Sequence, residues 1–310
     1  MDVFVTGATG VIGRRVVPAL STAGHDVTAV GRNEPKREQL RAQGARPIDV
    51  DLFDRDAVRR AVDGHEAVIN LATHIPSSAR AALPGAWRTN DRLRTEAAEA
   101  LVDAAIAAGA TRFVQESLAF MYADGGSEWL TEESPIDAAF QMASALTAEG
   151  HTARFAGAGG VGVVLRFGLF VAPDSAQTRD MVTFARRGIF ALPGAADGYV
   201  AFVHADDAAA AVVAALDAPG GTYNVLEDEP ATRAQHAAAW AEYVGRPVRV
   251  APAAVAKVPA MRALGRSQRV SNSAFRVATG WAPRYPELRR AWPQVADAVS
   301  AATDDDAVGR

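Results

Sequence analysis

The chain has 310 residues, a net charge of −4 and no cysteine. The lack of cysteine excludes disulfides and thiolate chemistry, and the absence of a basic block argues against a nucleic-acid partner. No apolar run reaches the roughly 18 residues of a membrane span, and the first strand begins too early to leave room for a signal peptide. We therefore expect a cytoplasmic protein with no nucleic-acid partner and no membrane segment.

The first fourteen residues, MDVFVTGATGVIGR, predict a dinucleotide-binding unit. A short apolar strand at 2–6 leads into Gly7, Gly10 and Gly13, and a helical pattern follows. In such a turn the first glycine allows a tight bend, the second lets a pyrophosphate approach, and the third lets helix and strand pack closely. The helix N-terminus directs free N–H groups at the phosphates. The predicted cofactor contacts here are Gly7, Thr9, Gly10, Val11, Ile12, Gly13 and Arg14.

Strands and helices then alternate as far as residue 167, which predicts an α/β fold with a doubly wound parallel sheet of Rossmann type. Strands are expected at 25–30, 46–50, 67–71, 111–115 and 161–167, and helices at 35–43, 54–62, 87–108 and 138–156. Beyond residue 170 the alternation ends, although 199–204 and 222–225 still have strand character.

This break suggests two interleaved parts. We assign 1–168 and 200–226 to the dinucleotide-binding Rossmann domain. A smaller C-terminal substrate lobe would comprise 169–199 and 227–302. The acidic tail, 303–310, is expected to be disordered.

Six landmarks in this order resemble the extended short-chain dehydrogenase/reductase family, in its epimerase/dehydratase-like branch. They are the segments 6–13, 51–52, 70–72, 165–168, 202–207 and 223–225. The resemblance implies a nicotinamide dinucleotide, with Asp51 and Leu52 flanking the adenine. It implies further that Leu71, Ala72 and Thr73 line the path to the nicotinamide ribose, and that Phe167 and Gly168 contact the nicotinamide.

The end of the second strand indicates which dinucleotide is bound. An acidic residue there would accept a hydrogen bond from the 2′-hydroxyl of NAD. This chain has Gly31, Arg32 and Asn33 instead. A guanidinium suits a 2′-phosphate, so we expect NADP, with Arg32 as the first candidate ligand, Asn33 beside it and Arg14 as the second. The alternative is that both arginines are ordinary solvated side chains.

The family's usual proton donor is missing. By the resemblance, a Tyr followed four residues later by a Lys should lie on the helix at 138–156. That segment has neither, and the chain has no Tyr between Tyr122 and Tyr199 and no Lys between Lys36 and Lys257. The expected place falls near residues 140–142. Ser117 alone matches the family's third active-site residue, a Ser or Thr.

Three functions stay open. The first is an NADPH-dependent reductase of a ketone on a polycyclic aromatic, polyketide-type substrate, in which a neighbouring phenol of the substrate supplies the proton. Polyketide ketoreductases of antibiotic biosynthesis resemble this chain in lacking the pair. The second is an NADP(H)-binding sensor or structural protein without chemistry, and the third is a sugar-nucleotide epimerase or dehydratase.

The expected substrate residues lie on loops beside the cofactor. They are His74, Met121, Tyr122 and Phe170. The six histidines show no ligand spacing, so no metal site is predicted. The small-molecule substrate is expected to be bound by a monomer or a homodimer.

Overall fold

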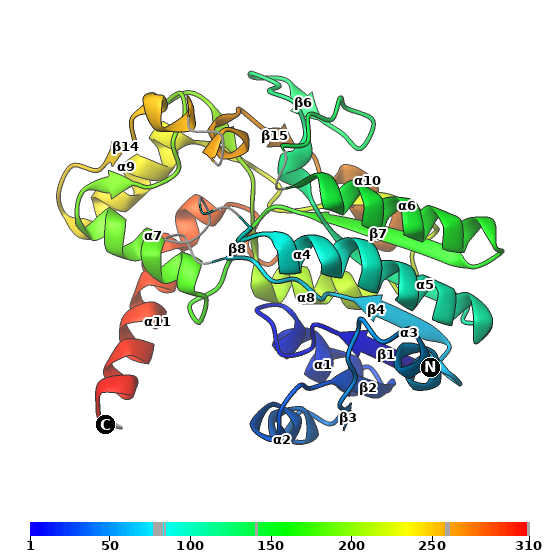
Figure 1. Cartoon of the computed structure of the whole chain (residues 1–310). Coiled ribbons are helices and arrows are strands. Elements are labelled where there is room, and N and C mark those ends of the chain that lie inside the picture. The colour runs from blue at the N-terminus through cyan, green and yellow to red at the C-terminus, as the bar shows by residue number, and fades with distance from the viewer. Residues whose placement is uncertain (77–82, 84, 140–141, 258–260, 309–310) are drawn as a thin grey trace.

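The computed structural model describes residues 1–76, 83, 85–139, 142–257 and 261–308, with side chains as far as residue 301. Its centre is a seven-stranded sheet in the order β12-β7-β5-β4-β1-β2-β3, in which every pair is parallel (Figure 1). The strands are β1 (Asp2–Thr6), β2 (Asp26–Val30), β3 (Arg46–Ile48), β4 (Ala67–Asn70), β5 (Arg112–Leu118), β7 (Val161–Phe167) and β12 (Gly221–Val225). The predicted α/β fold of Rossmann type is confirmed.

Helices cover both faces of this sheet, as the fully buried β1 residues Val3, Phe4 and Val5 require. On one face, α1 and α8 pack together over a core that includes Leu20. On the other face, α3, α5 and α6 enclose a core that includes Phe113. The helices are α1 (Gly13–Thr22), α2 (Glu34–Ala42), α3 (Arg55–Val62), α4 (Arg88–Arg92), α5 (Ala98–Ala107), α6 (Ala143–Gly157) and α8 (Ala205–Ala214), with a π-helical turn, η1 (Leu93–Ala97), joining α4 to α5.

From β1 the chain first forms β2 and β3 on one side, and then forms β4, β5, β7 and β12 on the other side. The strand order therefore reverses between β1 and β4. In open parallel sheets a ligand binds where this reversal leaves a crevice at the carboxyl ends of the strands. The loops after β1, β4, β5 and β7 therefore define the place for the site.

A second core lies beside the sheet domain and centres on Trp240 and Trp292, both fully buried. Its helices are α7 (Ala176–Arg186), α9 (Arg233–Val244) and α11 (Leu288–Val308), and α10 (Ser273–Thr279) packs near β12. Short strands complete this part: β6 (Trp129–Leu130), β8 (Leu169–Val171), β9 (Ile189–Phe190), β10 (Tyr199–Val200), β11 (Phe202–His204), β13 (Ala231–Thr232), β14 (Arg249–Val250) and β15 (Arg269–Val270).

Two parts of the chain bear on the predicted domain boundaries. Residues 200–204 add no strand to the large sheet, since β11 pairs with β8. Phe202 belongs to the second core, whereas Ala201 and Val203 belong to the core of the sheet domain, so the domain boundary there stays a prediction. The tail expected to be disordered from residue 303 continues α11 as far as Val308, because no proline or glycine interrupts the chain between Pro293 and Gly309. Residues 309–310 lie outside the described part.

Candidate cofactor and substrate site

The three glycines after β1 make the geometry of a phosphate-binding turn. Gly7 has a φ of +66°, and a Cβ there would lie 2.2 Å from the Leu71 carbonyl oxygen. A Cβ on Gly13 would lie 2.2 Å from the Gly7 carbonyl oxygen, so this position requires glycine for packing. Gly10 is exposed and its missing Cβ would meet only the Gly7 oxygen, at 3.1 Å. Gly10 is therefore the glycine that leaves space for a ligand.

The turn that leads into α1 has amides available to an anion. No side chain caps the helix at Ile12, and the amides of Val11, Ile12 and Gly13 have no partner among the described residues, whereas the amides of Arg14 and Arg15 donate to the carbonyls of Gly10 and Ile12. Thr9 and Val11 are half-buried beside the turn, whereas Ile12 is buried in the core. These residues fit the pyrophosphate of a dinucleotide.

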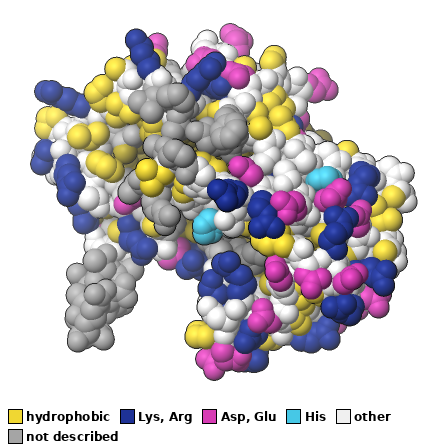
Figure 2. All heavy atoms as spheres, viewed as in Figure 1, with side chains coloured by type: hydrophobic (Ala, Val, Ile, Leu, Met, Phe, Trp, Pro, Cys, Tyr) yellow, Lys and Arg dark blue, Asp and Glu magenta, His cyan; other side chains and the backbone are white. Residues whose placement is uncertain are grey.

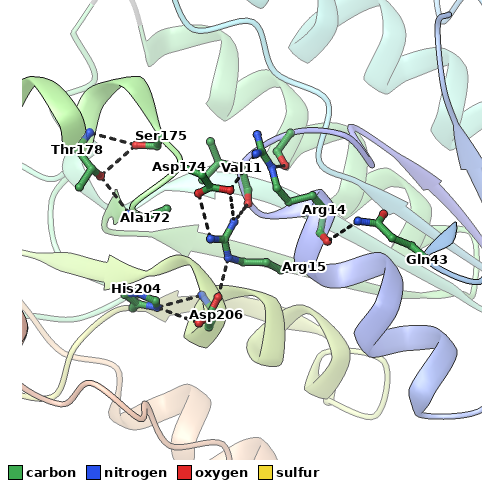
Figure 3. Close-up of polar contacts among 11 residues, drawn as sticks. Val11, Arg14, Arg15, Gln43, Ala172, Asp174, Ser175, Thr178, His204 and Asp206 are labelled. Carbon is green, nitrogen blue, oxygen red and sulfur yellow. Dashed lines mark hydrogen bonds and ion pairs between the residues drawn. The ribbon is translucent and has the colours of Figure 1, made fainter. Parts of the chain in front are cut away.

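The two candidate ligands of a 2′-phosphate have different surroundings. Arg32 is exposed at the end of β2, and its guanidinium has no hydrogen bond or ion pair among the described residues. Arg14 instead donates to Asp174, 2.8 Å from Nη1 to Oδ2, and to the Gly10 carbonyl (Figure 3). Asn33 caps α2 by accepting from the Lys36 amide. Arg32 therefore remains the candidate, and Arg14 is engaged elsewhere.

Asp174 connects the glycine turn to the second lobe. It follows β8 and accepts from both Arg14 and Arg15 (Figure 3). Arg15 also donates to Asp206 at the start of α8, 2.6 Å from Nε to Oδ1, and to the Val11 carbonyl. Asp174 could not be predicted from the sequence, because nothing near it in the chain indicates a partner 160 residues away.

Hydrogen bonds join the carboxyl ends of β1 and β4 to each other and to β5. Asn70 accepts from Thr6 Oγ1 at 2.6 Å and donates to Gln115 at 2.9 Å. The same Asn70 oxygen accepts from the Ala72 amide, which fixes the loop toward Thr73. Leu71 is buried, Thr73 is exposed, and Asp51 and Leu52 lie on the loop after β3 with Asp51 exposed. Contacts of these residues with a cofactor stay predictions.

The carboxyl end of β7 was expected to contact the nicotinamide. Phe167 is fully buried, and its ring lies 5.3 Å from that of the half-buried Phe170. Gly168 lies against β11, since a Cβ there would be 2.9 Å from the Ala201 carbonyl oxygen. The backbone of Gly168 and the ring of Phe170 are thus the parts that can face a ligand.

A buried polar network replaces the usual acid and base. Ser117 is fully buried and donates to Glu149 of α6 at 2.6 Å. Arg166 donates to both oxygens of Glu149, at 2.9 and 2.7 Å. The third Arg166 nitrogen, Nη1, donates to the Tyr122 hydroxyl at 2.9 Å, and that hydroxyl donates to Asn224 at 2.8 Å. The Ser117 hydrogen is therefore committed to Glu149 rather than to a ligand.

Tyr122 and Met121 are not positioned as expected. Tyr122 has no exposed surface, and burial raises the pKa of its hydroxyl, with Arg166 acting in the opposite sense. A phenol with two partners and no access cannot serve as a substrate's acid in this arrangement. Met121 packs in a small apolar cluster with Met142 and Ala145 and is 1% exposed. The expectation of substrate loops failed here because 119–121 folds inward as a single 3₁₀ turn.

The remaining substrate candidate, His74, is exposed after β4, and its amide donates to Asn90 at 3.0 Å. Of the place expected for the Tyr, positions 140 and 141 lie outside the described residues. Within α6 itself, the described helix carries Glu149 and no Tyr or Lys.

A small cavity of about 20 Å³, with room for about one water molecule, lies next to Gly168 between the two lobes. Its apolar wall includes Phe120, Leu169 and Leu264, and its polar wall includes Arg233 and Arg266. No motif or spacing in the sequence indicates that Glu149, Arg166, Arg233 and Arg266 lie near this part of the molecule. Their convergence depends on contacts between segments far apart in the chain.

No helix among the described residues is long and apolar enough to cross a membrane, and no group of metal-ligating side chains is found among them. Figure 2 shows acidic and basic side chains intermixed over one face of the sheet domain.

Relatives named as reductases match this chain. A 3-diazoavenalumate denitrifying reductase from a Streptomyces species is 36% identical over 307 residues, covering 93% of this chain and 98% of the relative. A 4-hydroxy-2-methyl-3-oxo-4-farnesyl-3,4-dihydroquinoline-1-oxide ketoreductase from Stigmatella aurantiaca is 31% identical over 134 residues, covering 43% of this chain and 38% of the relative. These relatives support an oxidoreductase role.

Solved structures share the fold over nearly the whole chain. The human epimerase family protein SDR39U1 with NADPH has a TM-score of 0.79 at 25% identity and covers 96% of this chain and 99% of its own. A Thermus thermophilus UDP-glucose 4-epimerase with NAD has a TM-score of 0.77 at 22% identity, covering 97% and 100%. A nicotinamide dinucleotide, NAD or NADP, is thus the supported cofactor. The model of the NAD-dependent epimerase/dehydratase family matches residues 3–225, and the chain belongs to this family.

Proposed function

We propose that this chain is an NADPH-dependent reductase whose substrate accepts a hydride without a proton from a Tyr–Lys pair. One observation supports this proposal above the others. The glycine turn has space for a phosphate, whereas the Ser117 hydroxyl donates its hydrogen to Glu149 at 2.6 Å and not to a ligand. Cofactor binding is supported, whereas the usual acid is absent from the described helix α6. Hydride transfer depends on placement above the nicotinamide more than on an acid.

Each part of the site would have its own role in binding NADPH and the substrate. A bound NADPH supplies the hydride. The α1 N-terminus and the Gly10 backbone would hold its pyrophosphate, and Arg32 would bind the 2′-phosphate. Phe170 and the backbone of Gly168 would form one wall of the nicotinamide and substrate site.

A ketone on a polycyclic aromatic substrate is the first candidate acceptor. A phenol beside the ketone polarises the carbonyl through an internal hydrogen bond and can supply the proton, leaving a delocalised phenolate. Buried apolar walls suit a flat aromatic ligand. The ketoreductase among the relatives supports this class.

An aromatic diazo compound is a second candidate, favoured by the relative named as a denitrifying reductase. An arenediazonium cation, ArN₂⁺, takes a hydride at its terminal nitrogen and becomes the neutral diazene ArN=NH. The diazene then loses N₂, and its hydrogen ends on the ring carbon as ArH. The cofactor is oxidised by two electrons, the substrate is reduced by two, and no enzyme acid is needed. This balance suits a site without Tyr or Lys.

The test is an assay in which the full chain is mixed with NADPH and one compound of a panel at a time. Oxidation of NADPH is followed by the loss of its absorbance. The panel contains an ortho-hydroxyaryl ketone, its O-methyl ether, an arenediazonium salt and UDP-glucose. We expect oxidation of NADPH with the hydroxyaryl ketone or the diazonium salt, and far slower turnover of the ether. Epimerisation of UDP-glucose would instead support the sugar-nucleotide alternative. Binding of NADPH with no turnover of any compound would support the sensor alternative.

Two variants test the absence of an enzyme acid. Ser117→Ala and Tyr122→Phe should each lose less than the roughly 10²- to 10⁴-fold typical of removing a positioned acid. Thermal midpoints are measured in parallel, because both side chains belong to a buried network. Loss of all turnover in either variant, with an unchanged midpoint and unchanged NADPH affinity, would identify that residue as the acid.

A further inference from the structure

Two arginines in the first turn of α1 bind the backbone of the glycine turn. Arg14 Nε donates to the Gly10 carbonyl at 3.1 Å. Arg15 Nη1 donates to the Val11 carbonyl at 2.8 Å. In a planar trans peptide unit the C=O and N–H groups point in opposite directions. Fixing these two carbonyls therefore also fixes the direction of the amides that follow them in the chain, those of Val11 and Ile12.

The Val11 and Ile12 amides are available to an anion. Neither has a partner among the described residues. They directly precede α1, where free N–H groups and the helix dipole both favour a phosphate. Gly10 is exposed beside them and has no side chain to obstruct a ligand. The two guanidiniums thus bind the carbonyl side of these peptide units, and a pyrophosphate would lie on the amide side.

The carboxylate of Asp174 holds both guanidiniums in this position (Figure 3). It accepts from Arg15 Nη2 at 3.0 Å and from Arg14 Nη1 at 2.8 Å. Burial disfavours its ionised form, but Arg15 and Arg14 hold the pKa of Asp174 below its ordinary value. The carboxylate is therefore ionised at neutral pH. Asp206 is a further partner of Arg15.

Asp174 is itself held in place by the beginning of α7. The next residue, Ser175, caps this helix by accepting from the Thr178 amide at 3.1 Å. The Thr178 hydroxyl accepts from the Ala172 amide at 3.0 Å, and both Ser175 and Thr178 are buried. Asp174 lies in the chain between these fixed residues, so its carboxylate can impose a position on the arginines.

We propose that Asp174 is a positioning residue for the dinucleotide. Through the two arginines it directs the free amides of Val11 and Ile12 at the pyrophosphate. The second lobe would thereby set the affinity of the glycine turn for its ligand. This inference rests on the dinucleotide binding of the proposed function and not on its reduction chemistry, so a binding experiment tests it.

A positioning role and a simple charge effect predict opposite results when the Asp174 charge is removed. A carboxylate near a pyrophosphate repels it, so loss of the charge alone would raise the affinity. Loss of positioning would lower the affinity, because the peptide units of the turn would be free to rotate and their amides would no longer converge on the phosphates. The sign of the change therefore distinguishes the two.

The experiment measures by calorimetry how the full chain binds ADP-ribose, which contains the pyrophosphate, and adenosine, which lacks it. Asp174→Asn should raise the Kd of ADP-ribose about tenfold, the equivalent of about one hydrogen bond, and leave the Kd of adenosine unchanged. Asp217→Asn removes the same charge from an exposed position beyond the end of α8 and should change neither Kd. A structural role of Asp174 without positioning would change both ligands alike.

An unchanged or lower Kd of ADP-ribose in folded Asp174→Asn would overturn the inference, as would an equal loss for adenosine. The thermal midpoint shows whether the variant is folded. If it does not fold, a wild-type co-crystal with ADP-ribose decides. Phosphate oxygens within about 3.2 Å of the Val11 and Ile12 amides, with the Asp174 contacts kept, support the inference. A phosphate that displaces Asp174 from Arg15 overturns it.

The same data separate this inference from the proposed function. The expected loss in Asp174→Asn, without oxidation of NADPH by any compound of the panel, would refute the reductase and keep the positioning role. Wild-type protein that does not bind ADP-ribose would refute both.

Discussion

Each glycine of the turn has a separate role, and two substitutions distinguish them. Gly13→Ala places a Cβ 2.2 Å from a backbone oxygen, so we expect a loss of roughly 1–3 kcal/mol of unfolding free energy. Gly10→Val meets no such obstacle within 3 Å and should leave the fold intact while blocking the pyrophosphate. Urea unfolding and NADPH titration of both variants check this. NADPH binding by Gly10→Val at wild-type affinity would mean that the turn binds no dinucleotide.

We also predict that one residue, Arg32, decides between NADPH and NADH. Arg32→Ala should reduce the preference for NADPH over NADH by about 1–3 kcal/mol, because a charge-assisted contact to the 2′-phosphate is lost. Arg14→Ala removes a side chain that is bound to Asp174, and should change both affinities alike. Arg41→Ala, on the exposed face of α2, is the matched surface control. Equal binding of NADPH and NADH by the wild type would contradict the assignment.

Sequence reasoning worked at the residue scale where the information is local. The positive φ of Gly7 and the close approach at Gly13 follow from a motif of seven residues. The engagement of Arg14 with Asp174, and of Ser117 with Glu149, depends on partners 160 and 32 residues away. No spacing rule predicts such pairs, which is why Arg14 and Tyr122 were assigned roles that their contacts do not favour.

At the scale of elements, the start of α8 joins the two lobes. His204 caps this helix, with Nδ1 accepting from the Asp206 amide. Asp207 is instead buried and accepts from the amides of Arg284 and Tyr285, at 2.8 and 3.0 Å. Asp206 is partly exposed and pairs with Arg15. Of these two neighbouring aspartates, Asp207 thus has a buried structural carboxylate and Asp206 a partly exposed one.

This difference predicts unequal effects of the same substitution. Asp207→Asn replaces one acceptor with a donor that faces a backbone N–H, and should cost about 1–3 kcal/mol of unfolding free energy. Asp206→Asn loses a partly exposed ion pair and should cost about 0–1 kcal/mol. Urea unfolding of the two variants at neutral pH gives both values. A larger loss for Asp206→Asn would show that the Arg15 pair, rather than Asp207, holds the lobes together.

Element boundaries were predicted best where strands are buried. Strand β7 was expected at 161–167 and is found at Val161–Phe167, since a continuous apolar run covered on both faces has few alternatives. The helix expected from 138 begins as α6 at Ala143. The helix expected at 87–108 contains the π-helical turn η1, whose irregular hydrogen bonding leaves no mark in the hydrophobic pattern.

For the molecule as a whole, the sheet order follows from the alternation of strands and helices, whereas the second lobe does not. Its strands are two or three residues long, so they have no detectable period. Its core is instead defined by aromatic side chains brought together from α9 and α11, including Trp240 and Trp292, whose rings lie 5.0 Å apart. The sequence predicted that a lobe exists but could not predict which surfaces meet.

That aromatic core makes stability dependent on pH. His236 is fully buried, accepts from Trp292 Nε1 at 3.0 Å, and stacks 5.5 Å from Phe190. Burial lowers the pKa of His236 to about 3, below its ordinary value of 6.5. As pH falls, the unfolded chain protonates this histidine before the folded chain does. The contribution of His236 to the free energy of unfolding is therefore complete above pH 6.5 and is lost as pH falls from 6.5 toward 3.

Glu227 gives the free energy of unfolding the opposite dependence on pH. It is buried and accepts from the amides of Phe202 and Leu288, and burial raises its pKa from 4.5 to about 8. The folded chain holds this proton more tightly than the unfolded chain does. Its contribution is therefore complete at low pH and is lost as pH rises from 4.5 to about 8. A pH profile of the wild type alone would mix the two groups.

The difference between the wild type and His236→Gln isolates the histidine. The glutamine oxygen can still accept from Trp292, but the side chain does not titrate. Between about pH 7.5 and about pH 5, the wild type should lose about 2 kcal/mol more unfolding free energy than the variant, at about 1.4 kcal/mol for each pH unit below 6.5. Urea unfolding at the two pH values measures this, and Glu227 cancels because both proteins contain it. Equal losses would mean that the His236 ring takes up a proton in the folded lobe, and hence that water reaches the core between α9 and α11.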